Sequence, residues 1–133
     1  MTVGILLICH NEIGAELIET ATDMFERLPI RLAHIDVRQD DDPIDLLNVA
    51  RRRVAELDTG DGVLVMTDMY GSTPSNIAHR LRDRHAVQVL SGVNLPMLVR
   101  ALNYPRLPLT EMTTKACSGG RDGIIQEGAS DGA

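Results

Sequence analysis

The chain has 133 residues, of which 44% are hydrophobic, and its formal net charge is −6. A chain of this length buries about two-thirds of its unfolded surface, which is enough for one domain without disulfides or a structural metal. The negative charge argues against nucleic acid or an anionic membrane as a partner, and with 2 Tyr, 1 Phe and 0 Trp there is no stacking platform for bases or flavins. We therefore expect small molecules or other proteins as partners.

The first predicted element is a buried parallel strand that ends at a histidine. Residues 3–9 form an unbroken apolar run, and His10 follows it directly. A turn over residues 11–14 then leads into an amphipathic helix predicted over residues 15–28. Ligands collect at the carboxyl ends of the strands in an open α/β sheet, so His10 is a candidate for chemistry. Fold position alone is a weak argument, because a single histidine there can simply cap a loop.

Strand-like runs and helical patterns then alternate along the chain, which predicts an α/β fold with a doubly wound, mainly parallel sheet in flavodoxin-like order. Asp42 precedes Pro43 as an N-cap precedes the first residue of a helix. The predicted strands cover residues 30–37, 63–67 and 86–90, and the predicted helices cover residues 43–57, 74 to about 84, 94–102 and 109–117.

The last segment departs from this alternation. The final helix is expected to end at Ser118, Gly119 and Gly120, and residues 123–126 read as a short strand with no crossover helix after it. Such a strand must pair with a sheet edge, either its own or that of a neighbouring molecule. Residues 128–133 are small and polar and are predicted to be a disordered tail, so the single domain covers residues 1–127.

A second informative segment follows the strand predicted over residues 63–67. Asp68 ends that strand, Gly71 allows a tight loop, and Thr73 precedes a proline as an N-cap would. The loop over Gly71, Ser72 and Thr73 would present free backbone amides at a helix amino terminus, which favours binding of an anion such as a phosphoryl group. In a flavodoxin-like order the first and third strands are neighbours, so His10 and Asp68 should lie side by side.

An imidazole, a carboxylate and an anion-binding loop together suit transient phosphorylation of the imidazole. Asp68 would fix the tautomer of His10 and leave the other ring nitrogen free to attack phosphorus. Phosphoryl transfer requires mainly positioning and charge stabilisation, so no metal and no other cofactor is expected. Taken alone, Asp68 reads equally well as a loop-capping aspartate and Thr73 as an ordinary N-cap. Their convergence with His10 favours a functional site.

Three stretches of the chain also resemble, in order and spacing, the enzyme IIA component of the mannose family of the bacterial sugar phosphotransferase system. The stretches are residues 4–10, residues 68–76 and residues 91–98, and the resemblance runs from Met1 to about Gln126. It implies that His10 is phosphorylated, that Asp68 orients it, and that the loop from Gly71 to Thr73 binds the phosphoryl group. It also implies a homodimer in which the last short strand is exchanged between subunits.

Three functions remain open. The first is a phosphocarrier that accepts a phosphoryl group from an HPr-like phosphohistidine protein and passes it to a IIB-type protein, expected on a separate chain, during sugar uptake. The second is a regulatory protein with the same His10 chemistry and no sugar transport. The third is a flavodoxin-like module that binds a nucleotide or another anion, which the lack of a G-x-G-x-x-G or P-loop pattern weakens. Met69 and Ser72 depart from the pattern of transport members, which leaves the sugar and the partner undetermined.

The remaining metal-type ligands show no pattern of a site. Cys9 and Cys117 lie far apart, and Cys9 and His10 should point to opposite faces of a strand, so we predict no metal. His34, His79 and His85 are expected to be structural or exposed, since no partner that combines a carboxylate with a glycine-rich loop can be placed beside them. The apolar run at residues 3–9 is too short for a signal peptide or a membrane span and no basic region precedes it, so a cytoplasmic protein is expected.

Overall fold

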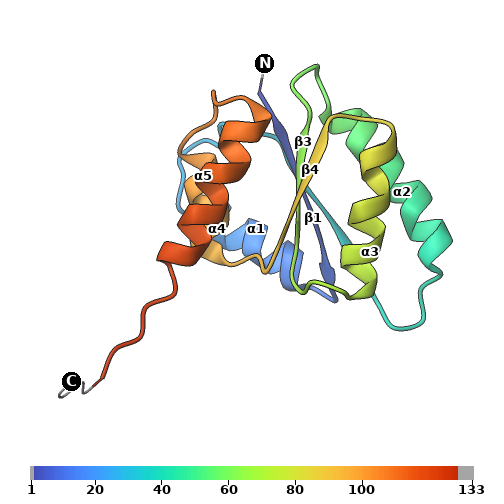
Figure 1. The fold of residues 1–133 in the computed structure, drawn as a ribbon, viewed down its shortest axis with the longest axis horizontal. Coiled ribbons are helices and arrows are strands. Elements are labelled where there is room, and N and C mark those ends of the chain that lie inside the picture. The colour runs from blue at the N-terminus through green and yellow to red at the C-terminus, as the bar shows by residue number, and fades with distance from the viewer. Residues whose placement is uncertain (1, 129–133) are drawn as a thin grey trace.

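A four-stranded parallel sheet forms the centre of the protein (Figure 1). The structure is a computed structural model, and it describes residues 2–128. The strands are β1 (Gly4–His10), β2 (Leu32–Val37), β3 (Val63–Thr67) and β4 (Val87–Ser91), and they lie in the order β2-β1-β3-β4. This is the order of flavodoxin-like sheets, so the predicted fold class and the adjacency of the first and third strands are confirmed.

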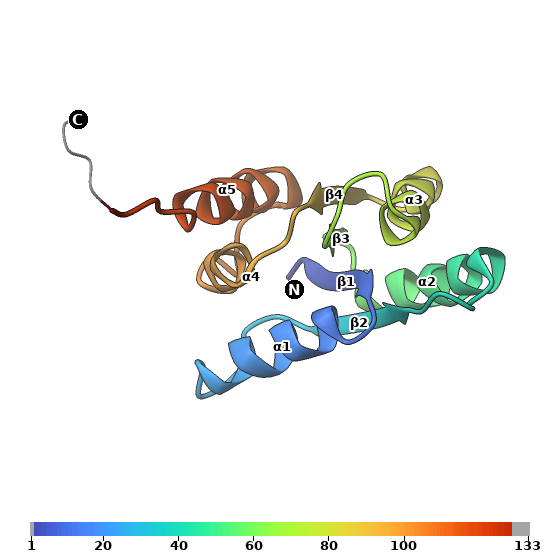
Figure 2. The same ribbon diagram turned by 90° about the horizontal axis from the view of Figure 1, so that it is seen from below.

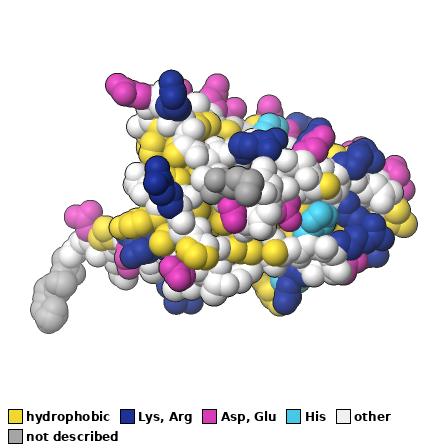
Figure 3. Space-filling model, turned by 90° about the horizontal axis from the view of Figure 1, so that it is seen from above, with side chains coloured by type: hydrophobic (Ala, Val, Ile, Leu, Met, Phe, Trp, Pro, Cys, Tyr) yellow, Lys and Arg dark blue, Asp and Glu magenta, His cyan; other side chains and the backbone are white. Residues whose placement is uncertain are grey.

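Helices cover both faces of the sheet, as Figure 2 shows when the molecule is seen from below. One face is covered by α1 (Ile13–Asp23), α4 (Leu95–Leu102) and α5 (Leu109–Asp122). The other is covered by α2 (Pro43–Leu57) and α3 (Thr73–Arg80), with a 3-10 turn at Leu81–Asp83. Seen from above, onto the amino ends of the strands, many Lys and Arg side chains gather on the right, the side of α2 and α3 (Figure 3).

Strand β1 divides the core into two clusters. Leu7 and Cys9 belong to the cluster under α1, α4 and α5, whereas Leu6 and Ile8 belong to the cluster under α2 and α3. The strand is therefore apolar at successive positions because both faces of the sheet are buried. All residues of β1 are buried except the last, His10, which is half-buried where the strand leaves the core.

Element boundaries differ from the expected ones where irregular segments also pack. Helix α1 ends at Asp23 rather than at residue 28, yet Phe25 and Leu28 beyond it still contact the core. Strand β2 begins at Leu32 rather than at residue 30, although Ile30 is 3% exposed. In both places the apolar pattern reports burial, and burial extends into chain that is neither helix nor strand.

The carboxyl-terminal segment corrects two expectations. Helix α5 continues through Gly119 and Gly120 to Asp122, and residues 123–126 form no strand. The two glycines do not end the helix, and they let α5 approach α4 closely. A Cβ at Gly119 would lie 2.5 Å from the Cβ of Arg100, and the Asn94 side-chain amide donates to the carbonyl of Gly120 at 3.0 Å.

Beyond α5, the chain leaves the body of the protein (Figure 1). Ile124 and Ile125 are 76% and 74% exposed. Their exchange between two subunits stays a prediction. The tail expected over residues 128–133 lies outside the described residues apart from Gly128.

Candidate functional site

His10 and Asp68 meet at the carboxyl edge of the sheet. Strands β1 and β3 pair with Ile8 opposite Thr67, so the residues that follow each strand lie together. One carboxylate oxygen of Asp68, Oδ2, accepts the backbone N–H of His10 at 3.0 Å and lies 2.8 Å from its Nδ1. The carboxylate therefore holds both the backbone and the ring of His10.

This contact determines which ring nitrogen is free. An ionised carboxylate can only accept hydrogen bonds, so the proton of a neutral imidazole is on Nδ1 and the lone pair is on Nε2. The His10 side chain is 37% exposed and that of Asp68 is 12% exposed. The second oxygen of Asp68, Oδ1, is buried without a hydrogen-bond partner among the described residues, so His10 is the main group that offsets this negative charge.

A sharp turn follows His10 and keeps its side chain at the edge of the sheet. Asn11 has a φ of +48°, a left-handed conformation that asparagine tolerates better than most residues. Its N–H donates to the carbonyl of Val37 in β2 at 2.9 Å. The chain thus reverses within two residues and enters α1 at Ile13.

The loop between β3 and α3 is tight, and its capping residue is one position earlier than expected. Gly71 has a φ of +83°, which favours glycine. The N-cap is Ser72, not Thr73, since Ser72 is extended and its carbonyl accepts the N–H of Asn76 at 2.9 Å. Thr73 is already helical, and Pro74 fits the second helical position because the first turn needs no N–H from it. The Ser72 hydroxyl donates back to the carbonyl of Met69 at 2.6 Å and so does not cap the helix.

A cavity of about 650 Å³ joins part of the predicted site. His10 and Thr73 both line it, whereas Gly71 and Ser72 are outside its lining. Arg38 and Asp41, from the loop after β2, line it too, and neither was among the predicted site residues. The signal for Arg38 was its position directly after Val37, the residue that pairs with His10 across β1 and β2.

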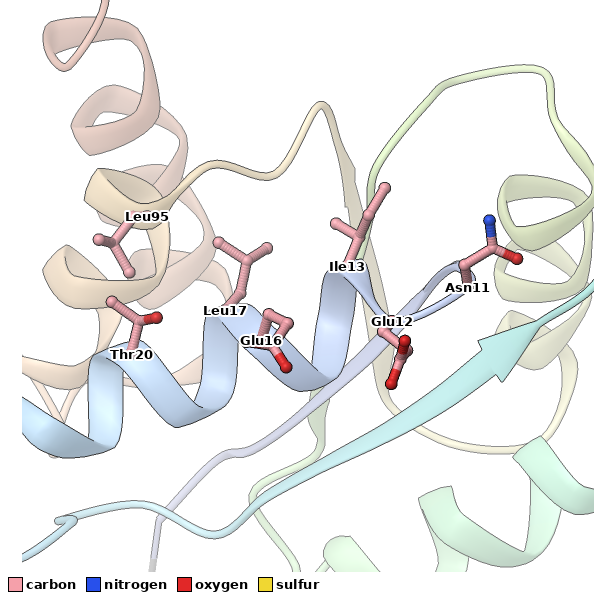
Figure 4. Close-up of a pocket in the computed structure, with 7 residues that line it drawn as sticks. All are labelled: Asn11, Glu12, Ile13, Glu16, Leu17, Thr20 and Leu95. Atoms are coloured by element: carbon pink, nitrogen blue, oxygen red, sulfur yellow. The ribbon is translucent and has the colours of Figure 1, made fainter.

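An apolar groove lies on the other side of the turn after His10. It has a volume of about 540 Å³ between α1 and α4, and Figure 4 shows Ile13, Leu17 and Leu95 bordering it. Close to Asp68 in the chain, Met69 and Tyr70 are 59% and 75% exposed. The exposure of large apolar side chains at Ile13, Met69 and Tyr70, close in the chain to His10 and Asp68, favours a surface that binds another protein.

Cys9 precedes His10 but takes no part in the site. Burial raises the pKa of its thiol to about 12, with the negative charge of Asp68 adding to the effect. The thiol is therefore neutral and unreactive at physiological pH. Within residues 2–128, no group of three or more His, Cys, Asp or Glu side chains could hold a metal ion.

Two other histidines have carboxylate partners that the sequence did not indicate. The Nδ1 of His34 lies 2.9 Å from Asp36, two residues along the same strand. The Nδ1 of His85 lies 3.2 Å from Asp58, which is distant in the chain. His79 packs against Tyr70 with ring centroids 5.9 Å apart. Of the three, His34 could have been found from the two-residue period of a strand.

The comparisons with known proteins agree with this geometry. A family model named EIIA-man and described as "PTS system fructose IIA component" matches residues 4–115. The chain belongs to this family. The resemblance to the mannose-family IIA components is thereby confirmed.

Individual relatives show how far the similarity of this IIA-family chain extends. The "PTS system mannose-specific EIIAB component" of Escherichia coli K12 is 31% identical over 127 residues, which is 93% of this chain and 39% of that protein. The "Transcriptional regulatory protein LevR" of Bacillus subtilis is 31% identical over 113 residues, 80% of this chain and 12% of the regulator. The chain thus spans about two-fifths of the mannose-specific relatives and a smaller part of the regulator.

A solved structure supports the fold independently of the sequence match. The "Mannose/sorbose specific IIA subunit of phosphotransferase system" from Enterococcus faecalis superposes with a TM-score of 0.85 and 20% identity, covering 98% of both chains. Within residues 2–128, each helix of the IIA-family chain is too short or too polar to cross a membrane.

Proposed function

We propose that this chain is a phosphocarrier, phosphorylated on His10, that accepts its phosphoryl group from an HPr-like phosphohistidine protein. It passes the group to a IIB-type protein during sugar uptake. The observation that carries the proposal is the 2.8 Å contact between the Nδ1 of His10 and Asp68 in a chain of the IIA family.

The chemistry follows from the free nitrogen. The Nε2 lone pair of His10 forms a bond to phosphorus while the nitrogen–phosphorus bond of the donor breaks, and its electron pair stays on the donor ring. Because Nδ1 keeps its proton, the phosphorylated ring of His10 is cationic, and the carboxylate of Asp68 beside it offsets that charge. Transfer to the acceptor is the same exchange in reverse.

The phosphoryl group needs donors around it, and the amino terminus of α3 supplies them. The first turn of a helix has backbone N–H groups without intrahelical partners, and its dipole favours an anion. Thr73 lines the same cavity as His10, which supports this assignment. Gly71 and Ser72 set the conformation of the loop from which Thr73 projects.

The partners would dock around His10. The apolar side chains of Ile13, Met69 and Tyr70 are exposed near this edge of the sheet, and Ile13 is 46% exposed. Donor and acceptor both need access to the same Nε2, so they would use this surface in turn rather than together.

A homodimer is part of the proposal. Strand β4 is at the edge of the sheet, and an unpaired edge binds another strand readily. Ile124 and Ile125 are exposed on the chain that leaves α5, and pairing of this segment with the β4 edge of a second copy would cover both.

One experiment tests the phosphorylation directly. The protein is incubated with a phosphohistidine donor protein together with the system that phosphorylates that donor. The intact mass of the protein is then measured before and after acid treatment. We expect one acid-labile phosphoryl group, absent from His10→Ala. His85→Ala is the matched control, because His85 also contacts an aspartate through Nδ1 and is 34% exposed, against 37% for His10. If His10→Ala is phosphorylated as fully as the parent, the proposal is wrong.

A regulatory function is the second candidate, and the similarity to a transcriptional regulator favours it. In that case phosphorylation of His10 would report nutrient status to a target protein without moving sugar. Sugar uptake by cells that carry the parent or His10→Ala separates the two candidates. Loss of sugar uptake in the His10→Ala cells supports the carrier. Unchanged uptake together with altered gene expression in those cells supports the regulator.

A further inference from the structure

Positive charge is concentrated far from His10. The net charge of the chain is −6, yet arginines gather where α2 ends and β4 begins. Arg51 and Arg52 lie in α2, and Arg84 follows the 3-10 turn. Arg84 comes just before the amino end of β4, whereas His10 is at the carboxyl end of β1, so the two residues lie towards opposite edges of the parallel sheet.

The arginines surround a groove. It has a volume of about 230 Å³, and Arg51, Arg52, Arg84 and His85 line it together with one carboxylate, Asp83. Its apolar lining includes Val54 and Leu81, both of which are buried. Three guanidinium groups line the groove against Asp83 in the lining and Asp58 at the rim, so the groove is positively charged and attracts anions in a chain that is negative overall.

His85 is held in place at the rim of this groove. Asp58 accepts the backbone N–H groups of Gly60 and Gly62 on Oδ1, at 2.9 and 3.1 Å, and contacts the Nδ1 of His85 with Oδ2. The hydrogen bond from Gly60, and less strongly those from Gly62 and His85, lower the pKa of Asp58. An ionised Asp58 places the proton of a neutral His85 on Nδ1, so this contact fixes the ring at the rim and leaves Nε2 as an acceptor, not as a donor to an anion.

Arg51 has an unused donor at the same place. Its Nη2 donates to Asp83 at 3.0 Å, but its Nε is buried and has no hydrogen-bond partner among the described residues. A buried donor without a partner is costly, so the guanidinium of Arg51 has hydrogen-bonding capacity that its contact with Asp83 does not use.

We infer that this groove is a second anion site, which binds a small phosphate monoester through Arg52 and Arg84, with Arg51 as the third guanidinium in its lining. An arginine guanidinium can donate two parallel hydrogen bonds to two oxygens of a phosphate, and the apolar lining suits a short carbon chain. At about 230 Å³ the groove is smaller than the pockets that hold drug-sized ligands, which favours a molecule smaller than a nucleotide. Because the groove and His10 lie at opposite edges of the sheet, the ligand would not compete with the phosphorylation partners.

The test is an NMR titration of the ¹⁵N-labelled full chain at constant ionic strength, with glycerol 3-phosphate and inorganic phosphate as separate probes. We expect saturable shifts at the amides of residues 51–55 and 81–86, with a dissociation constant on the order of 1 mM. Tighter binding of glycerol 3-phosphate would identify a phosphate monoester, and equal binding would reduce the site to one for free phosphate and overturn the ester assignment. His10→Ala should bind both probes unchanged, which separates this groove from the edge that contains His10.

Variants decide whether the arginines form the site. Arg52→Gln and Arg84→Gln should each weaken binding about tenfold, as expected for loss of one charge-assisted contact. Arg27→Gln and Arg106→Gln, at exposed arginines elsewhere, are the matched controls and should bind as the parent does. Shifts that do not saturate, or equal binding by the groove variants and the controls, would overturn the inference. Neither result depends on whether His10 is phosphorylated.

Discussion

Replacing Asp68 by asparagine removes the charge beside His10 while it preserves the shape of the side chain. The magnitude follows from the contact. At about 4 Å between charge centres and an effective dielectric constant of about 20, a carboxylate stabilises a cationic ring by about 4 kcal/mol. Unscreened, this corresponds to about three orders of magnitude in rate, and because the partial exposure of His10 reduces it through solvent screening, we expect phosphoryl transfer to slow by about two to three orders of magnitude. The equivalent change in a serine protease triad lowers kcat about 10⁴-fold through the wrong tautomer.

Rapid-quench measurement of phosphoryl transfer from the donor protein gives the rate, and circular dichroism confirms that the variant is folded. Asp58 is unsuitable as a control, because it holds the amides of Gly60 and Gly62 as well as His85. Asp61→Asn is the matched control, since Asp61 is exposed and lies just before the amino end of β3. A rate for Asp68→Asn within threefold of the parent, or an equal loss in Asp61→Asn, would refute the role of Asp68.

The other predictions concern stability and assembly. Asp58→Asn should lower the free energy of unfolding at pH 7 by about 2 kcal/mol, because two backbone N–H groups lose an ionised acceptor. The lowered pKa of Asp58 means that this contribution is present above its unfolded pKa and disappears as the pH falls through the folded value. Urea unfolding of the parent and of Asp58→Asn at pH 7 and at a pH below the folded pKa of Asp58 checks this. A difference in unfolding free energy that is the same at both pH values would contradict it. Gly119→Ala should cost about 1–3 kcal/mol in the same assay, since its Cβ would lie 2.5 Å from α4, whereas the exposed Thr114→Ala should change little. A chain that ends at Asp122 keeps α5 and should sediment as a monomer or aggregate, while one that ends at Gln126 should form the dimer; a stable dimer of the shorter chain would show that this segment does not join the subunits.

The amino-acid sequence by itself determined the elements whose signals are local. The apolar run before His10 predicted β1, the cap at Asp42 predicted the start of α2, and the helix predicted from residue 94 is α4, for which Asn94 is the N-cap. Both caps are present, with Asp42 accepting the N–H of Ile44 and Asn94 that of Met97, each at 2.9 Å. These features depend on residues within one helical turn or one strand, so pattern and hydrogen-bonding capacity were sufficient.

His10 and Asp68 were found together because the strand order that brings them together follows from the alternation of strands and helices. The role of each in phosphoryl transfer stays a prediction. The site residue Arg38 was missed, since its place in the cavity depends on how the loop after β2 folds back towards Thr73.

Only the tertiary structure decided the features that depend on contacts between distant segments. In the sequence, Gly119 and Gly120 read as the end of a helix, but packing against α4 keeps them helical. The pairing of His85 with Asp58, 27 residues apart, had no local signal at all. Glycine occurs both at helix ends and where two helices pack closely, and the sequence does not distinguish the two cases. The carboxylate that contacts a histidine is brought to it by the fold. The physical reason is the same in both cases, because the partner that determines the outcome is near in space and remote in the chain.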